Sequence, residues 1–262
     1  MEILLTNDDG INSPALFKLA EELNKYGNVT VVAPDKDSSG KGASITLRDV
    51  LRFNKIDFGT NIDFYAVEGT PGDSVMIARK EIADKPFDLV VSGINYGANM
   101  GADVFVSGTV GAAIHGYLGG TLSIALSIGS VMESWLHNNS NSTASSDSVE
   151  TDITEAVKYS GLICKFISDN KISKPEVINI NFPPLENSKF NGAKNTFIGT
   201  RVEDEILIKE TNYPEESDME AIKKGYISVS KLDTNMSPGG YDVKSNLSAQ
   251  ITEYINKSFI KE

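Results

Sequence analysis

Two adjacent aspartates directly follow the first apolar segment of the chain. Residues 3–5 (Ile-Leu-Leu) have the character of a short buried strand, and two polar residues separate them from Asp8 and Asp9. A Ser-Pro pair at 13–14 then marks the start of a helix, because serine is a frequent N-cap and proline a frequent first helical residue. This strand–loop–helix unit places both carboxylates at the carboxyl end of a strand, the edge at which open α/β sheets bind ligands.

The aspartate pair carries most of the chemical information. Two neighbouring carboxylates repel each other unless a cation or a shared proton lies between them. A turn or capping role is the alternative, since aspartates are common in loops, but capping needs one carboxylate and Ser13 already serves the following helix. The pair therefore predicts a divalent-metal site.

Strand-like and helix-like segments alternate through the first half of the chain. This alternation indicates βαβ units, and it predicts an α/β fold with a mainly parallel sheet. We expect helices from Pro14, from Thr70-Pro71 with Asp73 completing the cap, and from about Thr109. The buried-strand runs are residues 28–33, 87–91 and 122–128, and residues 50–53 and 63–67 form a shorter antiparallel excursion.

The second half is more varied. We expect a surface loop at 136–150, which is rich in asparagine and serine, and a helix capped by Asp152 and Glu155 that runs to about Asp169. A strand at 176–181 precedes the Pro-Pro pair at 183–184.

Beyond that pair the chain offers only short β-like segments and a terminal helix. The segments are residues 195–199, 205–209 and 226–230, and the helix carries Leu247, Ile251, Tyr254, Ile255 and Phe259 on one stripe. The stripe suits packing on another subunit or on its own domain. We therefore divide the chain into a core at 1–184 and an extension at 185–262.

Composition limits the classes of partner. The net charge of −12 argues against a DNA or RNA polymer as ligand, because phosphate backbones are bound through lysine and arginine. We expect no membrane span, since no apolar run reaches about 18 residues, and no signal peptide, since the chain begins directly with a strand. The single cysteine, Cys164, is expected to be a buried small hydrophobe. A cytoplasmic location follows as the expectation.

Two further loops belong to the same sheet edge. Ser39-Gly40 alone indicates only a turn, but the pair follows the second strand and so should lie near Asp8. Residues 92–101 follow the third buried run and contain three glycines and two asparagines, which permit tight turns and close approach to a ligand. Asn95 in this segment offers a carbonyl oxygen suited to a hard cation.

A small-residue segment at 107–113 enters a helix. Backbone N–H groups and hydroxyls at a helix N-terminus form a ready anion site, so Ser107, Gly108 and Thr109 are candidates for binding phosphate. An ordinary N-cap at Thr109 is the simpler alternative, and both can hold together.

The candidate metal ligands are all oxygen atoms, which select Mg²⁺, Mn²⁺ or Ca²⁺ over zinc. The chain has two histidines, His115 and His137, so a Ser-His-Asp triad is not expected, and it has no P-loop pattern. These groups suit metal-assisted hydrolysis of a phosphate ester, in which Asp8 or Asp9 positions the attacking water. The segment 107–109 would hold the remaining phosphate oxygens.

At this point the chain resembles the SurE family, the stationary-phase survival proteins that act as metal-dependent 5′-nucleotidases. Six motifs carry the resemblance in the family's order, and a seventh segment, 225–229, resembles its C-terminal strand. The six are residues 4–10 (Leu-Leu-Thr-Asn-Asp-Asp-Gly), 31–35 (Val-Val-Ala-Pro-Asp), 39–40 (Ser-Gly), 69–71 (Gly-Thr-Pro), 91–95 (Val-Ser-Gly-Ile-Asn) and 107–113 (Ser-Gly-Thr-Val-Gly-Ala-Ala).

The resemblance implies a Rossmann-like three-layer core with one Mg²⁺ or Mn²⁺ ion per subunit, held by Asp8, Asp9, Ser39 and Asn95. It implies a phosphatase that hydrolyses nucleoside 5′-monophosphates to nucleoside and phosphate, with 3′-nucleotides and short polyphosphate as further substrates. The phosphate- and substrate-binding residues that we expect are Asn7, Gly40, Asn99, Ser107, Gly108 and Thr109.

The resemblance also implies a homodimer or homotetramer whose C-terminal segments exchange between subunits. The chain departs from the family's pattern at 36–44, 137–148 and 200–220. Base preference, 5′ against 3′ preference, the physiological metal, the proton donor and dimer against tetramer are therefore left open.

Other classes of protein share parts of this pattern. A response-regulator receiver needs an aspartate at the end of its third strand, where this chain has Ser92-Gly93, and a haloacid-dehalogenase-type phosphatase needs one at position 10, which is glycine. A non-catalytic nucleotide-binding or signalling module with a Rossmann-like fold remains the alternative function.

Overall fold

The computed structural model describes residues 1–129, 146–185, 189–199, 214–233 and 246–259. The strands are β1 (Glu2–Thr6), β2 (Asn28–Pro34), β3 (Phe53–Ile56), β4 (Asp63–Val67), β5 (Leu89–Tyr96), β6 (Leu122–Ile128), β7 (Val177–Phe182), β8 (Ala193–Thr196) and β9 (Ile227–Leu232). The α-helices are α1 (Pro14–Leu23), α2 (Pro71–Ile77), α3 (Gly108–Leu118), α4 (Ser146–Asp169), α5 (Asp218–Lys223) and α6 (Asn246–Phe259). A π-helical turn, η1 (Ala78–Ile82), extends α2, and a 3₁₀ turn, η2 (Gly101–Phe105), precedes α3.

All of the described strands join one nine-stranded sheet in the order β3-β4-β2-β1-β5-β6-β7-β9-β8. The six strands from β4 to β7 in this order are mutually parallel, whereas β3 and β9 pair antiparallel with β4 and β7. The predicted α/β fold with a mainly parallel sheet is confirmed. The chain builds outward from β1 in one direction and then from β5 in the other, so the topological switch point lies between these two strands.

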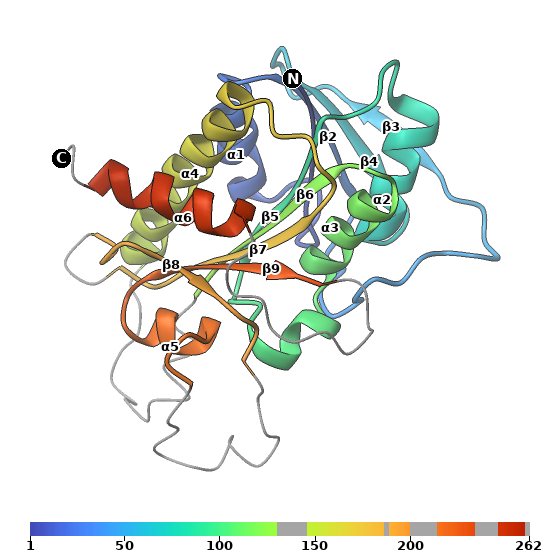
Figure 1. Ribbon diagram of the computed structural model, residues 1–262. Helices are drawn as coiled ribbons and strands as arrows, with labels where there is room; N and C mark the ends of the chain where they lie inside the picture. The colour runs from blue at the N-terminus through green and yellow to red at the C-terminus, as the bar shows by residue number, and fades with distance from the viewer. Residues whose placement is uncertain (130–145, 186–188, 200–213, 234–245, 260–262) are drawn as a thin grey trace.

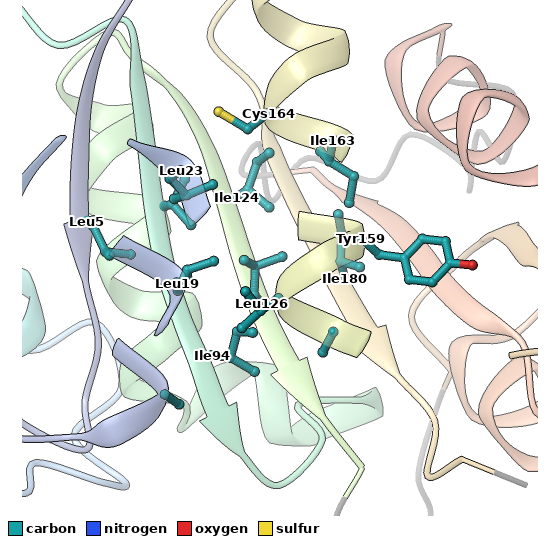
Figure 2. Packing of buried hydrophobic residues seen from close by; sticks show 14 of the residues in the cluster. Leu5, Leu19, Leu23, Ile94, Ile124, Leu126, Tyr159, Ile163, Cys164 and Ile180 are labelled. Atoms are coloured by element: carbon teal, nitrogen blue, oxygen red, sulfur yellow. The ribbon is translucent and has the colours of Figure 1, made fainter. Parts of the chain in front are cut away.

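Helices cover both faces of the sheet, which gives the three layers that a doubly wound fold requires. In Figure 1, α1, α4 and α6 lie on one side of the sheet and α2 and α3 on the other. The larger hydrophobic cluster fills the first side, where Leu19 and Leu23 of α1 meet Leu126 of β6 and Ile163 of α4 (Figure 2). Smaller clusters fill the side of α2 and α3.

The two faces of β7 differ in chemistry. Its even-numbered residues, Ile178, Ile180 and Phe182, belong to the large cluster under α4. Side chains alternate along a strand, so Asn179 and Asn181 point to the opposite face, where Val177 packs in the cluster that contains residues of α3. Both asparagines are fully buried, so their amides need partners within the protein.

Local sequence signals account for two helix starts. Helix α2 begins with the predicted capping box, in which the Thr70 hydroxyl accepts from the Asp73 N–H (3.1 Å) and an Asp73 carboxylate oxygen accepts from the Thr70 N–H (2.9 Å). Helix α1 begins at Pro14 as predicted, but the Ser13 side chain makes no capping hydrogen bond. The fixed backbone of Pro14 is enough to start that helix.

The predicted start of α4 was wrong, and so was the N-cap that we considered for α3, although α3 begins at Gly108, close to the predicted start. Helix α4 begins at Ser146 rather than after Asp152, so the surface loop predicted at 136–150 is helical over 146–150, and residues 136–145 lie outside the described part. Asp152 instead accepts a hydrogen bond from the Leu185 N–H (3.1 Å). Helix α3 has its N-cap at Ser107, whose hydroxyl accepts from the Val110 N–H (3.1 Å), two residues before the Thr109 cap that we considered.

The C-terminal residues continue the same sheet. Strand β9 pairs with β7, and α6 packs on its own chain by burying Ile251 and Ile255 and by bonding Asn256 to both backbone polar atoms of Ala193 (2.6 and 2.9 Å). The strand predicted at 205–209 and the side chains of Leu247 and Phe259 lie outside the described part. Exchange of this extension between subunits, and the division at residue 184, stay predictions.

Within the described residues, no helix combines the length and the apolar character that crossing a membrane requires.

Candidate metal centre

The candidate site lies at the switch point of the sheet. Asp8 and Asp9 follow β1, and Asn95 lies near the end of β5, the strand that pairs with β1 in parallel register from Ile3↔Leu89 to Thr6↔Ser92. Because parallel strands end at one edge, the loops after β1 and β5 meet there. The structure therefore brings these two loops to one place, as the sequence predicted.

Asp8 is held by the start of α3. The Thr109 hydroxyl donates to Asp8 Oδ1 (2.5 Å), and the Thr109 N–H donates to Asp8 Oδ2 (3.2 Å). The side chain lies so close to Gly108 that a Cβ atom there would be 2.9 Å from Asp8 Oδ2. Burial raises the pKa of the Asp8 carboxyl, and the hydrogen bonds from Thr109 act in the opposite direction. Thr109 thus fixes both the position and the orientation of this carboxylate.

Asp9 is the unsatisfied member of the pair. Its Oδ2 atom is buried and has no hydrogen-bond partner. Burial, with smaller contributions from the charges of Asp8 and Asp37, raises the pKa of the Asp9 carboxyl to about 7. A buried carboxylate oxygen without a partner is costly, and a bound cation removes that cost by supplying positive charge. The donor chemistry of this pair therefore fits a divalent metal ion.

The loop that carries the two aspartates is closed by Asn7. Its side chain donates to the Gly10 carbonyl (3.1 Å) and accepts from the Gly10 N–H (3.2 Å). Gly10 has φ of +98°, a conformation that other residues rarely adopt. The predicted phosphate-binding residue Asn7 thus has both polar atoms engaged in the turn, and its role toward phosphate stays a prediction.

The loop after β2 approaches the aspartates through its backbone, since the Ser38 N–H donates to the Asp8 carbonyl (2.8 Å). The next residue, Ser39, is exposed, and both its hydroxyl (2.5 Å) and its N–H (2.8 Å) donate to Asp37 Oδ1. These bonds lower the pKa of the Asp37 carboxyl. The charge of Asp37 contributes to the raised pKa values of Asp8 and Asp9. The exposed Gly40 lies further along this loop and has φ of +71°.

An irregularity in β5 sets the orientation of Asn95. The register with β6 shifts between Ser92 and Asn95, and a Cβ atom at Gly93 would lie 2.2 Å from the Leu126 carbonyl oxygen. Only glycine allows this close approach of the two strands. The Asn95 side-chain N–H donates to the Gly97 carbonyl (2.7 Å), which commits the nitrogen of the amide and leaves the oxygen as the atom available to a cation.

Asn99 lies deeper than the sequence suggested. Its side-chain nitrogen donates to the Ser127 hydroxyl (2.7 Å), and its backbone bonds to Asn179 and Asn181 of β7. The side chain is directed at the sheet, so its assignment to substrate binding stays a prediction.

The segment 107–109 forms the N-terminus of α3, a helix of eleven residues. Ser107, Gly108 and Thr109 are all buried, and the positive end of the helix dipole lies at this point. The same helix end thus holds Asp8 through both donors of Thr109, and the Val110 N–H donates to the Ser107 hydroxyl, so the role of this segment toward phosphate stays a prediction.

Further polar groups lie beneath the site. Thr6 and Ser92 are register partners on β1 and β5, and their hydroxyls are buried without a hydrogen-bond partner. No cluster of three or more His, Cys, Asp or Glu side chains suited to a metal occurs among the described residues. The predicted ligand set of two carboxylates, a hydroxyl and an amide stays a prediction.

Sequence reasoning missed two functional relationships. Thr109 was considered for phosphate or as a helix cap, and its bond to Asp8 over 101 positions has no local signal. Asp37 was passed over, although the Asp-x-Ser spacing at 37–39 is a signal for the turn in which an aspartate side chain accepts from the N–H two residues on.

Comparison with known proteins finds similar chains of one family. The family described as "Survival protein SurE" matches residues 3–205. A 5′-nucleotidase SurE of Dehalococcoides mccartyi strain CBDB1 is 35% identical over 249 residues, covering 88% of each chain. A 5′-nucleotidase SurE of Legionella pneumophila strain Paris is 35% identical over 254 residues, covering 90% of this chain and 92% of its own. The crystal structure of the SurE protein from Aquifex aeolicus superposes with a TM-score of 0.72 at 30% identity and covers all of both chains.

Proposed function

We propose that this chain, which belongs to the SurE family, is a metal-dependent nucleotide phosphatase. It hydrolyses nucleoside 5′-monophosphates to nucleoside and phosphate. The observation that carries the proposal is the buried, unpartnered Asp9 Oδ2 beside Asp8, with Asp8 itself seated at the N-terminus of α3. This arrangement supports the proposal that a cation and a phosphate bind next to each other at this edge of the sheet. A protein that only binds nucleotide has no need of a buried carboxylate oxygen without a partner, such as Asp9 Oδ2, next to the phosphate site.

The proposed cation ligands are Asp8, Asp9, Ser39 and Asn95, with Mg²⁺ or Mn²⁺ as the ion and one ion per subunit. Their oxygen atoms match the preference of these hard cations. When bound, such a cation supplies positive charge against the phosphoryl oxygens and eases deprotonation of water.

The residues of this chain then have separate roles in the hydrolysis. The N-terminus of α3, with Ser107, Gly108 and Thr109, holds and orients the phosphate. Asp8 or Asp9 positions a water molecule for attack on phosphorus, opposite the ester oxygen. The new phosphorus–oxygen bond forms while the bond to the ribose oxygen breaks, and that oxygen leaves as the nucleoside hydroxyl after taking up a proton.

The test is phosphate release from a panel of nucleoside monophosphates with Mg²⁺ or Mn²⁺, then with EDTA, then with metal restored. We expect release that stops with EDTA and returns with metal. Absence of release with every metal and nucleotide, together with measurable nucleotide binding, would favour the non-catalytic nucleotide-binding module instead.

Finer features belong to the same proposal. We propose that 3′-nucleotides and short polyphosphate are secondary substrates, which the same panel ranks. We also propose a homodimer or homotetramer in which residues 185–262 exchange between subunits around cores formed by residues 1–184, which light scattering of the full chain and of a chain ending at 184 would test. A cytoplasmic location is proposed from the single buried cysteine, Cys164, which forms no disulfide.

A further inference from the structure

The backbone at residues 99–101 is held by three side chains from the second half of the chain. Asn181 bonds to both backbone polar atoms of Asn99, accepting from its N–H (2.8 Å) and donating to its carbonyl (3.1 Å). Asn179 donates to the same carbonyl (2.8 Å), and Asp218 Oδ2 accepts from the Gly101 N–H (2.9 Å). All three side chains have no exposed surface. We refer to Asn179, Asn181 and Asp218 as the loop clamp.

Asp218 brings two segments together through one carboxylate. It is the first residue of α5, and its Oδ1 atom accepts from the Gly199 N–H (2.8 Å) and from the Met219 N–H (2.9 Å). A buried carboxylate is expensive unless hydrogen bonds compensate for the lost water, and these three N–H donors provide them. One of the three belongs to the loop after β5, so this loop and α5 share a single anchor.

The clamped segment leads directly to the proposed phosphate site. The Asp103 N–H donates to the Met100 carbonyl (3.0 Å), and the Ser107 N–H donates to the Asp103 carbonyl (3.0 Å). Ser107 is the N-cap of α3, and Asn95 lies at the other end of the segment. The loop clamp therefore fixes the middle of the segment that joins the proposed metal ligand Asn95 to the proposed phosphate-binding helix end.

We propose that Asn181 and Asp218 are positioning residues for phosphate binding, acting through the backbone of residues 99–101 on the N-terminus of α3. The inference rests on the proposed function, because it assigns the phosphate site to that helix end. It goes beyond the proposed function because β7 and α5 contribute no predicted ligand and yet, in this proposal, affect substrate affinity.

A second polar cluster on the same part of the sheet provides a control, because a change there affects stability without affecting residues 99–101. The Thr196 hydroxyl bonds to the hydroxyls of Ser228 (2.8 Å) and Ser230 (2.7 Å), and all three residues are buried. Ser230 is the register partner of Asn179 on β9, yet its hydroxyl bonds to Thr196 on β8. Loss of a hydroxyl here weakens the sheet without touching the loop.

The test is the Asp218→Asn variant of the full chain with saturating Mg²⁺. The amide is close in shape to the carboxylate, and its oxygen still accepts from Gly199 and Met219, but its NH₂ then opposes the Gly101 N–H. We expect KM for a nucleoside monophosphate, and the inhibition constant of inorganic phosphate, to rise about fivefold or more while kcat falls less. The metal concentration for half-maximal activity should change less than KM, because three of the four proposed ligands, Asp8, Asp9 and Ser39, lie on other loops.

The matched control is Ser230→Ala. Destabilisation alone reduces the folded fraction, which lowers apparent kcat and leaves KM unchanged, and that is the expected result for this variant. Wild-type KM and phosphate inhibition in Asp218→Asn would overturn the proposal. If Asp218→Asn does not fold, Asn181→Leu, which removes both bonds to Asn99 at similar volume, takes its place under the same criterion.

If the proposed function is wrong, the experiment gives a different result. The wild-type protein would then show no turnover with any metal, and calorimetric titration with inorganic phosphate replaces the kinetics. Weaker phosphate binding by Asp218→Asn than by Ser230→Ala would still support the loop clamp, and equal binding by the two variants would reject it.

Discussion

Thr109 and Asp8 are 101 positions apart in the sequence and share two hydrogen bonds, one from the Thr109 hydroxyl and one from its N–H. The pair joins the end of β1 to the start of α3. A carboxylate of the proposed metal site is therefore held at the start of the helix whose end we propose binds phosphate, so the two proposed sites are adjacent in the fold.

The hydroxyl of Thr109 should matter more for activity than for stability. Thr109→Val keeps the shape of the side chain and removes the 2.5 Å bond to Asp8 Oδ1. We expect kcat/KM for a nucleoside monophosphate to fall about tenfold or more, with a loss of about 1–2 kcal/mol in the free energy of unfolding. Thr196→Val, which also removes a buried hydroxyl, is the control and should lose stability without a comparable loss of kcat/KM.

Each aspartate of the pair should be indispensable for turnover. Asp8→Asn and Asp9→Asn remove one negative charge from the cation site, and we expect turnover to fall to background in both while circular dichroism stays that of the wild type. Calorimetric titration with Mn²⁺ would show whether metal binding is lost with activity. A fully active Asp8→Asn protein would contradict the assignment of the site.

The stability of the metal-free protein should depend on pH through Asp9. Its pKa in the folded state is raised to about 7, above the unfolded value, so its neutral form favours folding. This contribution is fully present below about pH 4, where both states are protonated, and is lost as pH rises through 7. In EDTA we therefore expect the Tm to fall between pH 5 and pH 8, and to fall less in Asp9→Asn.

The same carboxylate predicts how metal acts on stability. Above pH 7 the ionised Asp9 is uncompensated without metal, so Mg²⁺ or Mn²⁺ should raise the Tm more at pH 8 than at pH 5.5. Asp9→Asn at pH 8 in EDTA should be more stable than the wild type by about 2 kcal/mol. Melting curves that show equal stabilisation by metal at both pH values would contradict this account of the site.

Gly108 should tolerate no side chain. A Cβ atom there would lie 2.9 Å from both Cβ and Oδ2 of Asp8, so Gly108→Ala must displace that carboxylate. We expect a large loss of kcat and a loss of about 1–3 kcal/mol in the free energy of unfolding. In an Asp8→Gly background both contacts disappear, so the same Gly108→Ala change should cost measurably less stability than in the wild type.

The features that the sequence predicted correctly depend on residues that are close to each other in the chain. The capping box at Thr70 and Asp73 spans three residues, and the helix start at Pro14 follows from the fixed backbone of proline. Asp152 shows the limit of such reasoning, because its spacing to Glu155 imitates a capping box while its carboxylate bonds to Leu185 N–H, 33 positions away. The helix continues through that residue, since a local capping signal does not oblige a helix to stop.

The sequence by itself determined the fold class and the aspartate pair. The alternation of strand-like and helix-like segments and the adjacency of Asp8 and Asp9 are local features of the chain, so they do not depend on how the helices and strands pack. The tertiary structure alone decided which buried polar groups meet. Sheet order places Asn181 of β7 beside Asn99 and brings Asp218 to Gly101 across 117 positions. A buried carboxylate or amide must find partners wherever the packed chain supplies them, and those partners depend on the packing of all the elements at once.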